Sequence, residues 1–332
     1  MSARVIIIFG GTGMLGQHTA KELVDKGETV VVTGVRRQMP VLLQGAIERK
    51  QAFVEYIDLT DPYAVMGLVA KYKPDTVVDT SGYAPKQLAP AAEVRARVTA
   101  ELNLLEAAKL NSVKRIVLTS SSDAYWGLGP ECMPLKEDMA SPLQEDDDNF
   151  IVQSWAKKTL EVIANLYRRQ EGLNIVTVRC SGMYGPIYRT FLNLPSRLIK
   201  AGLSGCAPDF SKGSGVPVET DGYDQTYVKD IAYGMGLVIR APSLKHHIYN
   251  LGSGRAVTYG EIARAAEKAI PGFKVELRSA VQDPPTTSRL EVNMGNFYMD
   301  ISRIRDELGY EPRYSPERGM ADYAEWLRAH EM

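Results

Sequence analysis

Three glycines near the N-terminus have the spacing of a phosphate-binding turn. Gly10, Gly13 and Gly16 follow an apolar run and open a segment of helical periodicity that includes Met14 and Leu15. Glycine lets such a turn bend sharply, lets a pyrophosphate approach the backbone, and lets the helix pack closely on the strand. The helix N-terminus offers N–H groups and a positive dipole end to an anion. We therefore predict that these five residues bind a dinucleotide.

The end of the second apolar run indicates which dinucleotide is bound. A protein that binds NAD usually has a carboxylate there for the ribose hydroxyls, whereas this chain has Gly34, followed by Arg36 and Arg37. A carboxylate would repel a 2′-phosphate, and a guanidinium offers it a planar, permanently charged fork. The pattern favours NADP over NAD. Two solvated loop arginines without a ligand would give the same pattern.

Short apolar runs alternate with segments of helical periodicity over the first 180 residues. The runs predict strands at 4–9, 29–33, 52–56, 76–80, 115–119 and 175–179, and the segments between them predict helices at 14–26, 61–72, 90–110 and 153–170. Nearly continuous apolar strands separated by helices are typical of a parallel sheet that is covered on both faces. We predict an α/β protein with a doubly wound Rossmann sheet, whose strand ends carry the site.

The pattern changes after residue 180. Frequent Gly and Pro predict a long loop at 203–224, and helices are predicted at 228–240, at 258–269 and from residue 316. A Pro/Thr-rich link is predicted near 283–288 and an acidic loop at 145–148. We expect residues 1–180 to form an NADP-binding domain. Residues 181–332 should form most of a smaller substrate-binding region that is partly interleaved with it.

Composition and charge narrow the classes of partner. The chain has 332 residues, of which 39 are basic and 40 acidic, so its net charge of -1 provides no field that would gather nucleic acid. No apolar run approaches the roughly 20 residues of a membrane span. Three cysteines and four histidines are scattered and form neither a disulfide framework nor a metal-ligand pattern. We expect a cytoplasmic protein without a metal, whose partner is a small molecule.

Several segments resemble the extended short-chain dehydrogenase/reductases, the group that includes UDP-galactose epimerase, sugar-nucleotide dehydratases and dihydroflavonol-type reductases. The resemblance covers nearly the whole chain and rests on the glycine turn, Asp58-Leu59, Thr80-Ser81-Gly82 and the stretches 119–127, 179–186, 227–231, 249–252 and 308–312. It implies that Asp58 and Leu59 contact the adenine and that Ser81 lies beside the cofactor.

The resemblance also implies a catalytic set, with one departure. In the family, a Tyr-x-x-x-Lys pair on one helix performs the proton chemistry, with the lysine on the nicotinamide ribose. Ser122 matches the family's catalytic hydroxyl and Lys157 its lysine, but the tyrosine position is Gln153. An amide forms hydrogen bonds and does not shuttle a proton. Tyr125, three residues after Ser122, either supplies the missing hydroxyl or is a packed aromatic, so the catalytic candidates are these four residues.

These features predict an NADP-dependent oxidoreductase or redox isomerase of the epimerase/dehydratase type. Its substrate would be small and polar, including sugar-like molecules, with a reacting hydroxyl or carbonyl. The resembled enzymes that act on nucleotide sugars usually have an arginine and an aspartate here for the substrate diphosphate, whereas the stretch 289–294 reads Arg-Leu-Glu-Val-Asn-Met, without the aspartate, which argues against a nucleotide sugar. A redox-inactive NADP-binding sensor or regulatory protein is the alternative that Gln153 favours. A non-redox enzyme on the same fold is a further alternative.

Apolar residues at helical spacing also predict a homodimer. In the resembled family, the helices that correspond to 90–110 and 153–170 commonly pair across a two-fold axis. The residues expected at such an interface are Leu102, Leu105, Leu160, Ile163 and Leu166. The same leucines would show this spacing if they faced only their own sheet.

Overall fold

The computed structural model describes residues 4–82, 88–140, 142, 152–188, 190–211, 215–279 and 296–330. The chain divides into two compact units, and each takes its residues from three separate segments. Unit 1 comprises Met1–Trp126, Phe150–Cys180 and Ala232–Tyr249, and unit 2 comprises Gly127–Asn149, Ser181–Ile231 and Asn250–Met332. Residues 232–249, which the sequence pattern placed in the second region, therefore return to unit 1.

A seven-stranded sheet forms the centre of unit 1. Its order is β10-β6-β5-β4-β1-β2-β3, and the strands from β3 to β6 are parallel. The strands are β1 (Val5–Phe9), β2 (Thr29–Gly34), β3 (Ala52–Tyr56), β4 (Thr76–Asp79), β5 (Arg115–Ser121), β6 (Ile175–Cys180) and β10 (Ile248–Leu251). The direction in which the chain adds strands reverses between β1 and β4. Ligands of open parallel sheets bind beyond the strand ends at such a point, and the predicted Rossmann fold is confirmed.

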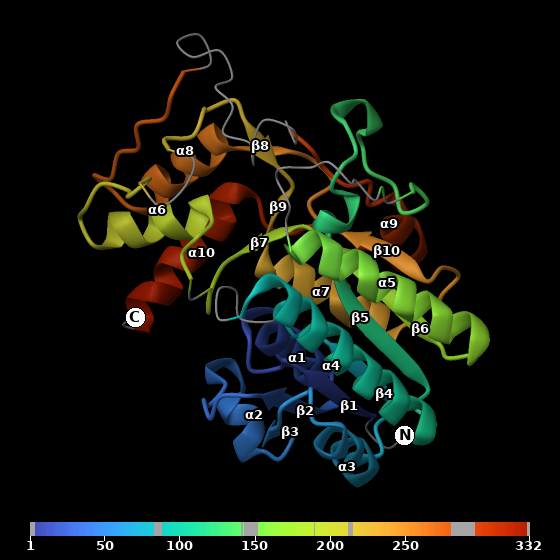
Figure 1. The fold of residues 1–332 in the computed structure, drawn as a ribbon. Helices are drawn as coiled ribbons and strands as arrows, with labels where there is room; N and C mark the ends of the chain where they lie inside the picture. The colour runs from blue at the N-terminus through green and yellow to red at the C-terminus, as the bar shows by residue number, and fades with distance from the viewer. Residues whose placement is uncertain are drawn as a thin grey trace. The chain divides into compact units, whose positions relative to one another are not determined.

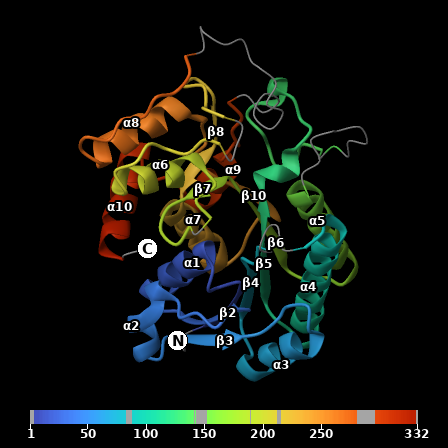
Figure 2. The ribbon, with the colours of Figure 1, turned by 60° about the vertical axis from the view of Figure 1, so that its left-hand side comes forward.

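Helices cover both faces of this sheet. On one face lie α3 (Pro62–Tyr72), α4 (Pro90–Leu110) and α5 (Val152–Gln170), and on the other lie α1 (Met14–Asp25) and the second half of α7 (Val228–Arg240) (Figures 1 and 2). Arg115 attaches α7 to the first residue of β5, because its Nη1 donates to the carbonyls of Val238, Ile239 and Ala241.

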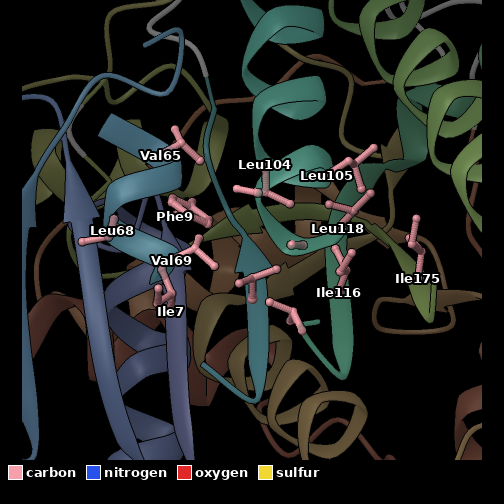
Figure 3. Close-up of a cluster of buried hydrophobic side chains, with 14 of the residues drawn as sticks. Ile7, Phe9, Val65, Leu68, Val69, Leu104, Leu105, Ile116, Leu118 and Ile175 are labelled. Atoms are coloured by element: carbon pink, nitrogen blue, oxygen red, sulfur yellow. The ribbon is translucent and has the colours of Figure 1, made fainter. Parts of the chain in front are cut away.

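An apolar cluster joins the first of these helical layers to the strands. Figure 3 shows side chains of β1 facing those of α3, and side chains of α4 lying beside those of β5. Burial of each Leu, Ile, Val or Phe contributes about 1.5–3 kcal/mol relative to leaving it in water. The labelled members are Ile7, Phe9, Val65, Leu68, Val69, Leu104, Leu105, Ile116, Leu118 and Ile175.

Unit 2 is built from helices and two short strand pairs. Its helices are α6 (Leu194–Leu203), α8 (Tyr259–Ala269), α9 (Ser302–Leu308) and α10 (Pro316–Ala329), and three of them, α6, α8 and α10, pack around a core that includes Tyr184, Tyr227 and Tyr323. The strand pairs are β7 (Gly182–Tyr184) with β9 (Gln225–Tyr227), and β8 (Gly222–Tyr223) with β11 (Val257–Thr258).

The sequence patterns missed the short elements. A helix at Gln44–Glu48 (α2), α6 and α9 were not predicted, because five to ten residues give only one to three turns of periodicity. The predicted loop at 203–224 starts at the last residue of α6 and contains β8. The segments 145–148 and 283–288 lie outside the described residues. Of the helices that the structure describes, none is long and apolar enough to span a membrane.

Candidate functional site

The glycine turn lies where β1 and β4 end side by side. Thr80 N donates to Phe9 O at 2.9 Å, so the two strand ends are directly bonded. Gly10 has a φ of +70°, and a Cβ added there would lie 2.6 Å from the Cα of Ser81. A larger residue at position 10 is therefore excluded by backbone strain and by the backbone of the neighbouring loop.

Helix α1 begins immediately after the turn and packs against it. A Cβ at Gly16 would lie 2.5 Å from the Cα of Gly11 and 2.8 Å from Thr80 Oγ1. The N-cap is Gly13, which provides no side-chain cap, and the first turn, which begins with Met14 and Leu15, carries no acidic residue. The amide groups at this helix N-terminus are therefore oriented for an anion without a competing carboxylate.

The end of β2 has no room for a carboxylate. Thr12 N donates to Thr33 O at 3.1 Å, and this bond places the Thr12 side chain above Gly34, where a Cβ would lie 2.1 Å from Thr12 Oγ1. Arg36 and Arg37 follow at the surface, and neither forms an ion pair with any residue in the described ranges. The end of β2 is thus followed by two arginines without an ion-pair partner among the described residues, and it has Gly34 where an acidic residue would favour NAD.

The remaining predicted cofactor residues lie after β3 and β4. Asp58 Oδ1 accepts hydrogen bonds from the amide and hydroxyl of Thr60, at 2.9 and 2.8 Å. The carbonyl of Leu59 accepts from Asn103 Nδ2 at 2.9 Å, and Ser81 N donates to Asp79 Oδ1 at 2.7 Å. Because these residues follow parallel strands, the structure brings them to the same edge of the sheet as the glycine turn.

Lys157 is buried at the end of β5. It lies on α5, is 6% exposed, and its Nζ donates to Thr119 O at 2.6 Å. Burial lowers the pKa of this ammonium, while the nearby Asp79 carboxylate acts in the opposite direction. Among the described residues, Thr119 O is the acceptor that holds this ammonium, and an ammonium has two further N–H donors that a ligand could use.

Ser122 and Gln153 are the next two catalytic candidates: Ser122 lies in the turn after β5, and Gln153 lies on α5, the helix that carries Lys157. Ser122 is buried in the 3-10 turn Ser122–Tyr125, which directly follows β5 and packs on α5. Gln153 is half-buried and precedes Lys157 by four residues on α5, so the two share a helical face. The arrangement combines a hydroxyl, an amide and an ammonium, and Gln153 stands where the resemblance expects the phenol that transfers the proton.

Tyr125 has the surroundings of a packed aromatic. Its ring is 2% exposed and lies under the Arg179 guanidinium, with 4.5 Å between the guanidinium carbon and the ring centre. Arg179 also forms an ion pair with Glu161 at 2.7 Å, and Ser120 Oγ donates to Glu161 Oε1 at 2.6 Å. Of the two interpretations of Tyr125, this network favours a structural role.

The residues predicted for a dimer interface do not share one surface. Leu105 and Leu160 are buried, because α4 and α5 pack on the sheet and on each other, whereas Leu166 is 56% exposed. Leu105 and Leu160 are therefore not available to a partner. The homodimer stays a prediction that rests on Leu102, Ile163 and Leu166.

Sequence reasoning missed the charged residues that surround Lys157. Glu93, Arg97 and Glu101 of α4 are buried, and the charges of Arg97 and Glu101 act on Lys157. Their i, i+4, i+8 spacing was the available signal, but that spacing also occurs on solvated helix faces. Within the described ranges, no group of three or more His, Cys, Asp or Glu side chains is arranged to hold a metal ion.

Unit 2 contains a polar cavity of about 370 Å³. Arg255, Arg305 and Asp230 contribute to its lining. Arg255 is paired with Glu261 at 2.9 Å and Arg305 with Glu311 at 2.7 Å, so these two cations are already compensated. Its volume is within the range of small-molecule sites.

Comparisons with known proteins agree with this architecture. The model of the NAD dependent epimerase/dehydratase family matches residues 6–252. The chain is 27% identical to the UDP-glucuronate 4-epimerase of Thermodesulfobacterium geofontis, over 97% of this chain and 95% of the relative. It is 25% identical to a dTDP-glucose 4,6-dehydratase of Actinoplanes sp., over 98% of both chains.

Solved structures show the same fold at lower identity. The UDP-glucose 4-epimerase of Thermotoga maritima superposes with a TM-score of 0.78 at 20% identity, covering 98% of this chain and 99% of that one. The dTDP-glucose 4,6-dehydratase of Bacillus anthracis, solved with NAD, gives 0.79 at 17% identity, covering 99% and 98%. The predicted resemblance is confirmed, and the chain belongs to the NAD dependent epimerase/dehydratase family.

Proposed function

We propose that this enzyme is an NADP-dependent oxidoreductase or redox isomerase that acts on a hydroxyl or carbonyl of a small, sugar-like substrate. The observation that carries the proposal is the position of Lys157: it is buried against Thr119 O of β5, at the same sheet edge as the glycine turn, and Ser122 lies in the turn that directly follows β5. That edge is where a dinucleotide binds in this type of sheet. A bound nicotinamide cofactor supplies the hydride acceptor and donor at this position.

The roles of the side chains follow from their chemistry. The Ser122 hydroxyl donates a hydrogen bond to the reacting oxygen, and Lys157 orients the ribose and stabilises negative charge on that oxygen. The Gln153 amide, on the same face of α5 as Lys157, donates a further hydrogen bond. Ser122 and Lys157 are buried, which excludes water around them and strengthens their electrostatic interactions.

Support for NADP comes from the end of β2. Thr12 occupies the space above Gly34, and Arg36 and Arg37 form no ion pair with an acidic residue in the part of the chain that the structure describes. A 2′-phosphate would complete this arrangement, whereas ribose hydroxyls would meet two unpaired cations and no carboxylate. Six of the similar solved structures contain NAD, so NAD is the competing cofactor.

Support for a sugar-like substrate comes from the relatives. Those named above act, by their names, on sugars linked to UDP or dTDP. The stretch 289–294, which by sequence argues against a substrate diphosphate, lies outside the described residues. We therefore propose a polyhydroxylated substrate and do not extend the proposal to a nucleotide.

Cofactor analysis of the purified protein tests this function. Denaturation should release NADP if the enzyme is an isomerase that retains its cofactor, and should release none if the cofactor exchanges at each turnover. In the second case, fluorescence titration should show NADPH bound at least about tenfold more tightly than NADH, a difference of about 1.4 kcal/mol. Binding of neither cofactor would overturn the proposal.

Gln153 supports a second candidate, a redox-inactive NADP-binding sensor. In that case NADPH would bind with the same preference, but no hydride transfer would occur. Incubation of the NADPH complex with a panel of keto-sugars, followed at the nicotinamide absorbance band, separates the two candidates. Oxidation of NADPH by any member of the panel excludes the sensor.

A further inference from the structure

The polar cavity of unit 2 is formed without any of the residues that are proposed for hydride transfer. Its volume is about 370 Å³, and most of its lining comes from the β7–β9 pair, the loop after β10 and residues 311–316. All of the lining residues belong to unit 2, whereas Ser122, Gln153 and Lys157 belong to unit 1. The cavity can therefore be considered as a feature of unit 2 alone.

Hydrogen bonds fix the walls of this cavity. The two oxygens of Asp230 accept from the backbone N–H groups of Arg313 and Tyr314, both at 2.9 Å, which anchors the segment before α10 to the start of α7. In the loop after β10, Ser253 donates to Asp224 Oδ1 through its backbone N and its Oγ, both at 2.8 Å. A ligand would therefore enter a cavity that is already formed, as is usual for small-molecule sites.

Two buried polar side chains of the lining have hydrogen-bonding capacity that is not used. Gln225 is 5% exposed, and its Nε2 has no partner among the described residues. Tyr184 is 2% exposed, and its hydroxyl forms no hydrogen bond with any residue in the described ranges. The two side chains share one face of the β7–β9 pair, because Tyr184 is the register partner of Tyr227, two residues after Gln225. Buried polar groups are ordinarily hydrogen-bonded, and the hydroxyl groups of a ligand would satisfy both.

The charged residues of the lining favour an anion. The lining contains three arginines, Arg255, Arg305 and Arg313, and two acids, Asp230 and Glu311, which leaves an excess of one positive charge. Both oxygens of Asp230 already accept from backbone N–H groups. Arg305 contacts Glu311 through Nε at 2.7 Å, so its two Nη groups have no partner in the part of the chain that the structure describes.

The ion pairs of two of these arginines do not exclude a further anion. The side chains of Arg305 and Glu311 are 44% and 64% exposed, and those of Arg255 and Glu261 are 48% and 31% exposed. Exposed ion pairs contribute little, because water and salt screen them. A guanidinium also has five N–H donors in a planar fork, so it can contact a carboxylate and a second anion at the same time.

We propose that this cavity binds a small organic phosphate that carries hydroxyl groups. The phosphate oxygens accept from Arg255, Arg305 and Arg313, which belong to separate segments of unit 2. The hydroxyl groups of the ligand bond to Tyr184 and Gln225. A phosphate has three terminal oxygens for donors that come from three segments, whereas a carboxylate has two. This site is additional to the proposed hydride-transfer site and does not depend on it.

Calorimetric titration of the whole chain with defined probes tests the proposal. Glucose 6-phosphate has both the phosphate and the hydroxyl groups, inorganic phosphate and glucose each have one of the two features, and glucuronate has a carboxylate in place of the phosphate. Glucose 6-phosphate should bind at least about tenfold more tightly than each of the other three probes, a difference of about 1.4 kcal/mol.

Three variants locate the bound probe. Arg305→Gln should weaken binding of glucose 6-phosphate by about 10- to 100-fold, as expected for a hydrogen bond to a charged group. Tyr184→Phe keeps the ring and should weaken binding of glucose 6-phosphate by about 3- to 10-fold, but should not affect inorganic phosphate. Arg328→Gln is the matched control, because Arg328 is exposed on α10 of the same unit, donates to Ala269 O at 3.3 Å and does not line the cavity. Arg305 is exposed, so its replacement keeps the test decisive if Tyr184→Phe does not fold.

The unfavourable outcomes are distinct from those of the proposed function. If Arg305→Gln binds glucose 6-phosphate as the wild type does, the probe occupies another place and the inference is wrong. Equal losses in Arg305→Gln and Arg328→Gln would show general attraction of an anion, which also overturns it. Binding of glucuronate as tightly as glucose 6-phosphate, or of no probe at about 10 mM, has the same consequence. The titrations contain no nicotinamide cofactor, so a failure of cofactor binding overturns the proposed function and leaves this inference intact.

Discussion

The two ends of the candidate cofactor site are built in different ways. At the glycine turn, backbone atoms form the surface, and a Cβ at Gly10 or Gly16 would overlap neighbouring main chain. At the end of β5, the surface consists of buried side chains, with Lys157 among several acids. The first end is specified by shape. The second is specified by charge, and a charged arrangement can be altered by single substitutions while the fold is kept.

Loss of Lys157 should have the largest effect of these substitutions. It should lower hydride transfer much more than it weakens cofactor binding. Lys157→Met keeps the apolar length of the side chain and removes its donors, so single-turnover hydride transfer should fall by about 10²–10⁴-fold. NADPH binding should weaken far less, because the glycine turn and Arg36 remain. Lys158→Met is the control, since Lys158 Nζ donates to Trp126 O. Equal losses in both variants would contradict the assignment.

At the end of β2, NADPH binding should depend on the charge of Arg36. Arg36→Asp should weaken NADPH binding by about 10- to 100-fold, which corresponds to the 1.5–3 kcal/mol of a hydrogen bond to a charged group. NADH lacks the 2′-phosphate and serves as the internal control in the same fluorescence titration. If both cofactors lose affinity equally, Arg36 only supports the loop.

The close contact between Gly34 and Thr12 can be tested with a pair of substitutions, the second of which should relieve the strain that the first introduces. Gly34→Ala places a methyl group against Thr12 Oγ1 and should destabilise the protein by about 1–3 kcal/mol through overpacking. Thr12→Ala removes the obstructing atoms, so the double variant should recover most of the loss in a urea-unfolding cycle. Additive effects would show that Thr12 is not the obstacle.

At the charged end, stability should depend on pH through Glu101. Its pKa in the folded protein is raised above the unfolded value of about 4.3, so its contribution is full below that pH and is lost as pH rises through the folded pKa. Each unit of pKa difference corresponds to about 1.4 kcal/mol. Urea unfolding of Glu101→Gln at pH 5 and pH 8 should therefore show a gain over the wild type that grows with pH. Parallel curves would contradict the raised pKa.

Tyr125 should show the smallest effect. Tyr125→Phe keeps the ring under Arg179 and removes only the hydroxyl, so hydride transfer should change by less than about threefold. A loss comparable with that of a general acid or base, about 10²-fold or more, would make Tyr125 the proton carrier.

The same contrast explains what the sequence predicts. The positive φ of Gly10 and the close approach of Gly16 to Gly11 are local requirements of the turn, so the glycine spacing and the strand before it are sufficient signals. Lys157 and Gln153 are predicted from the resemblance to the family's Tyr-x-x-x-Lys motif, which is also local in sequence. Glu101 is not, because an acid on a helix is ordinarily solvated, and only the packing of α4 over the sheet buries it. Leu105 and Leu160 were misassigned for a related reason: periodicity identifies an apolar face but not the neighbour that covers it.

The hydrogen bonds of Arg115 to the last residues of α7 affect the order in which unit 1 completes its fold. They join positions 123 to 126 residues apart, and two of the three segments of unit 2 lie between them in the chain. A nascent chain that ends near residue 180 has six strands of the sheet, but the layer on the α7 face is incomplete and the Arg115 guanidinium lacks these carbonyls. Such long-range closure slows folding and leaves apolar surface exposed during synthesis. Division of the gene at the predicted boundary between residues 180 and 181 would therefore produce an aggregation-prone fragment.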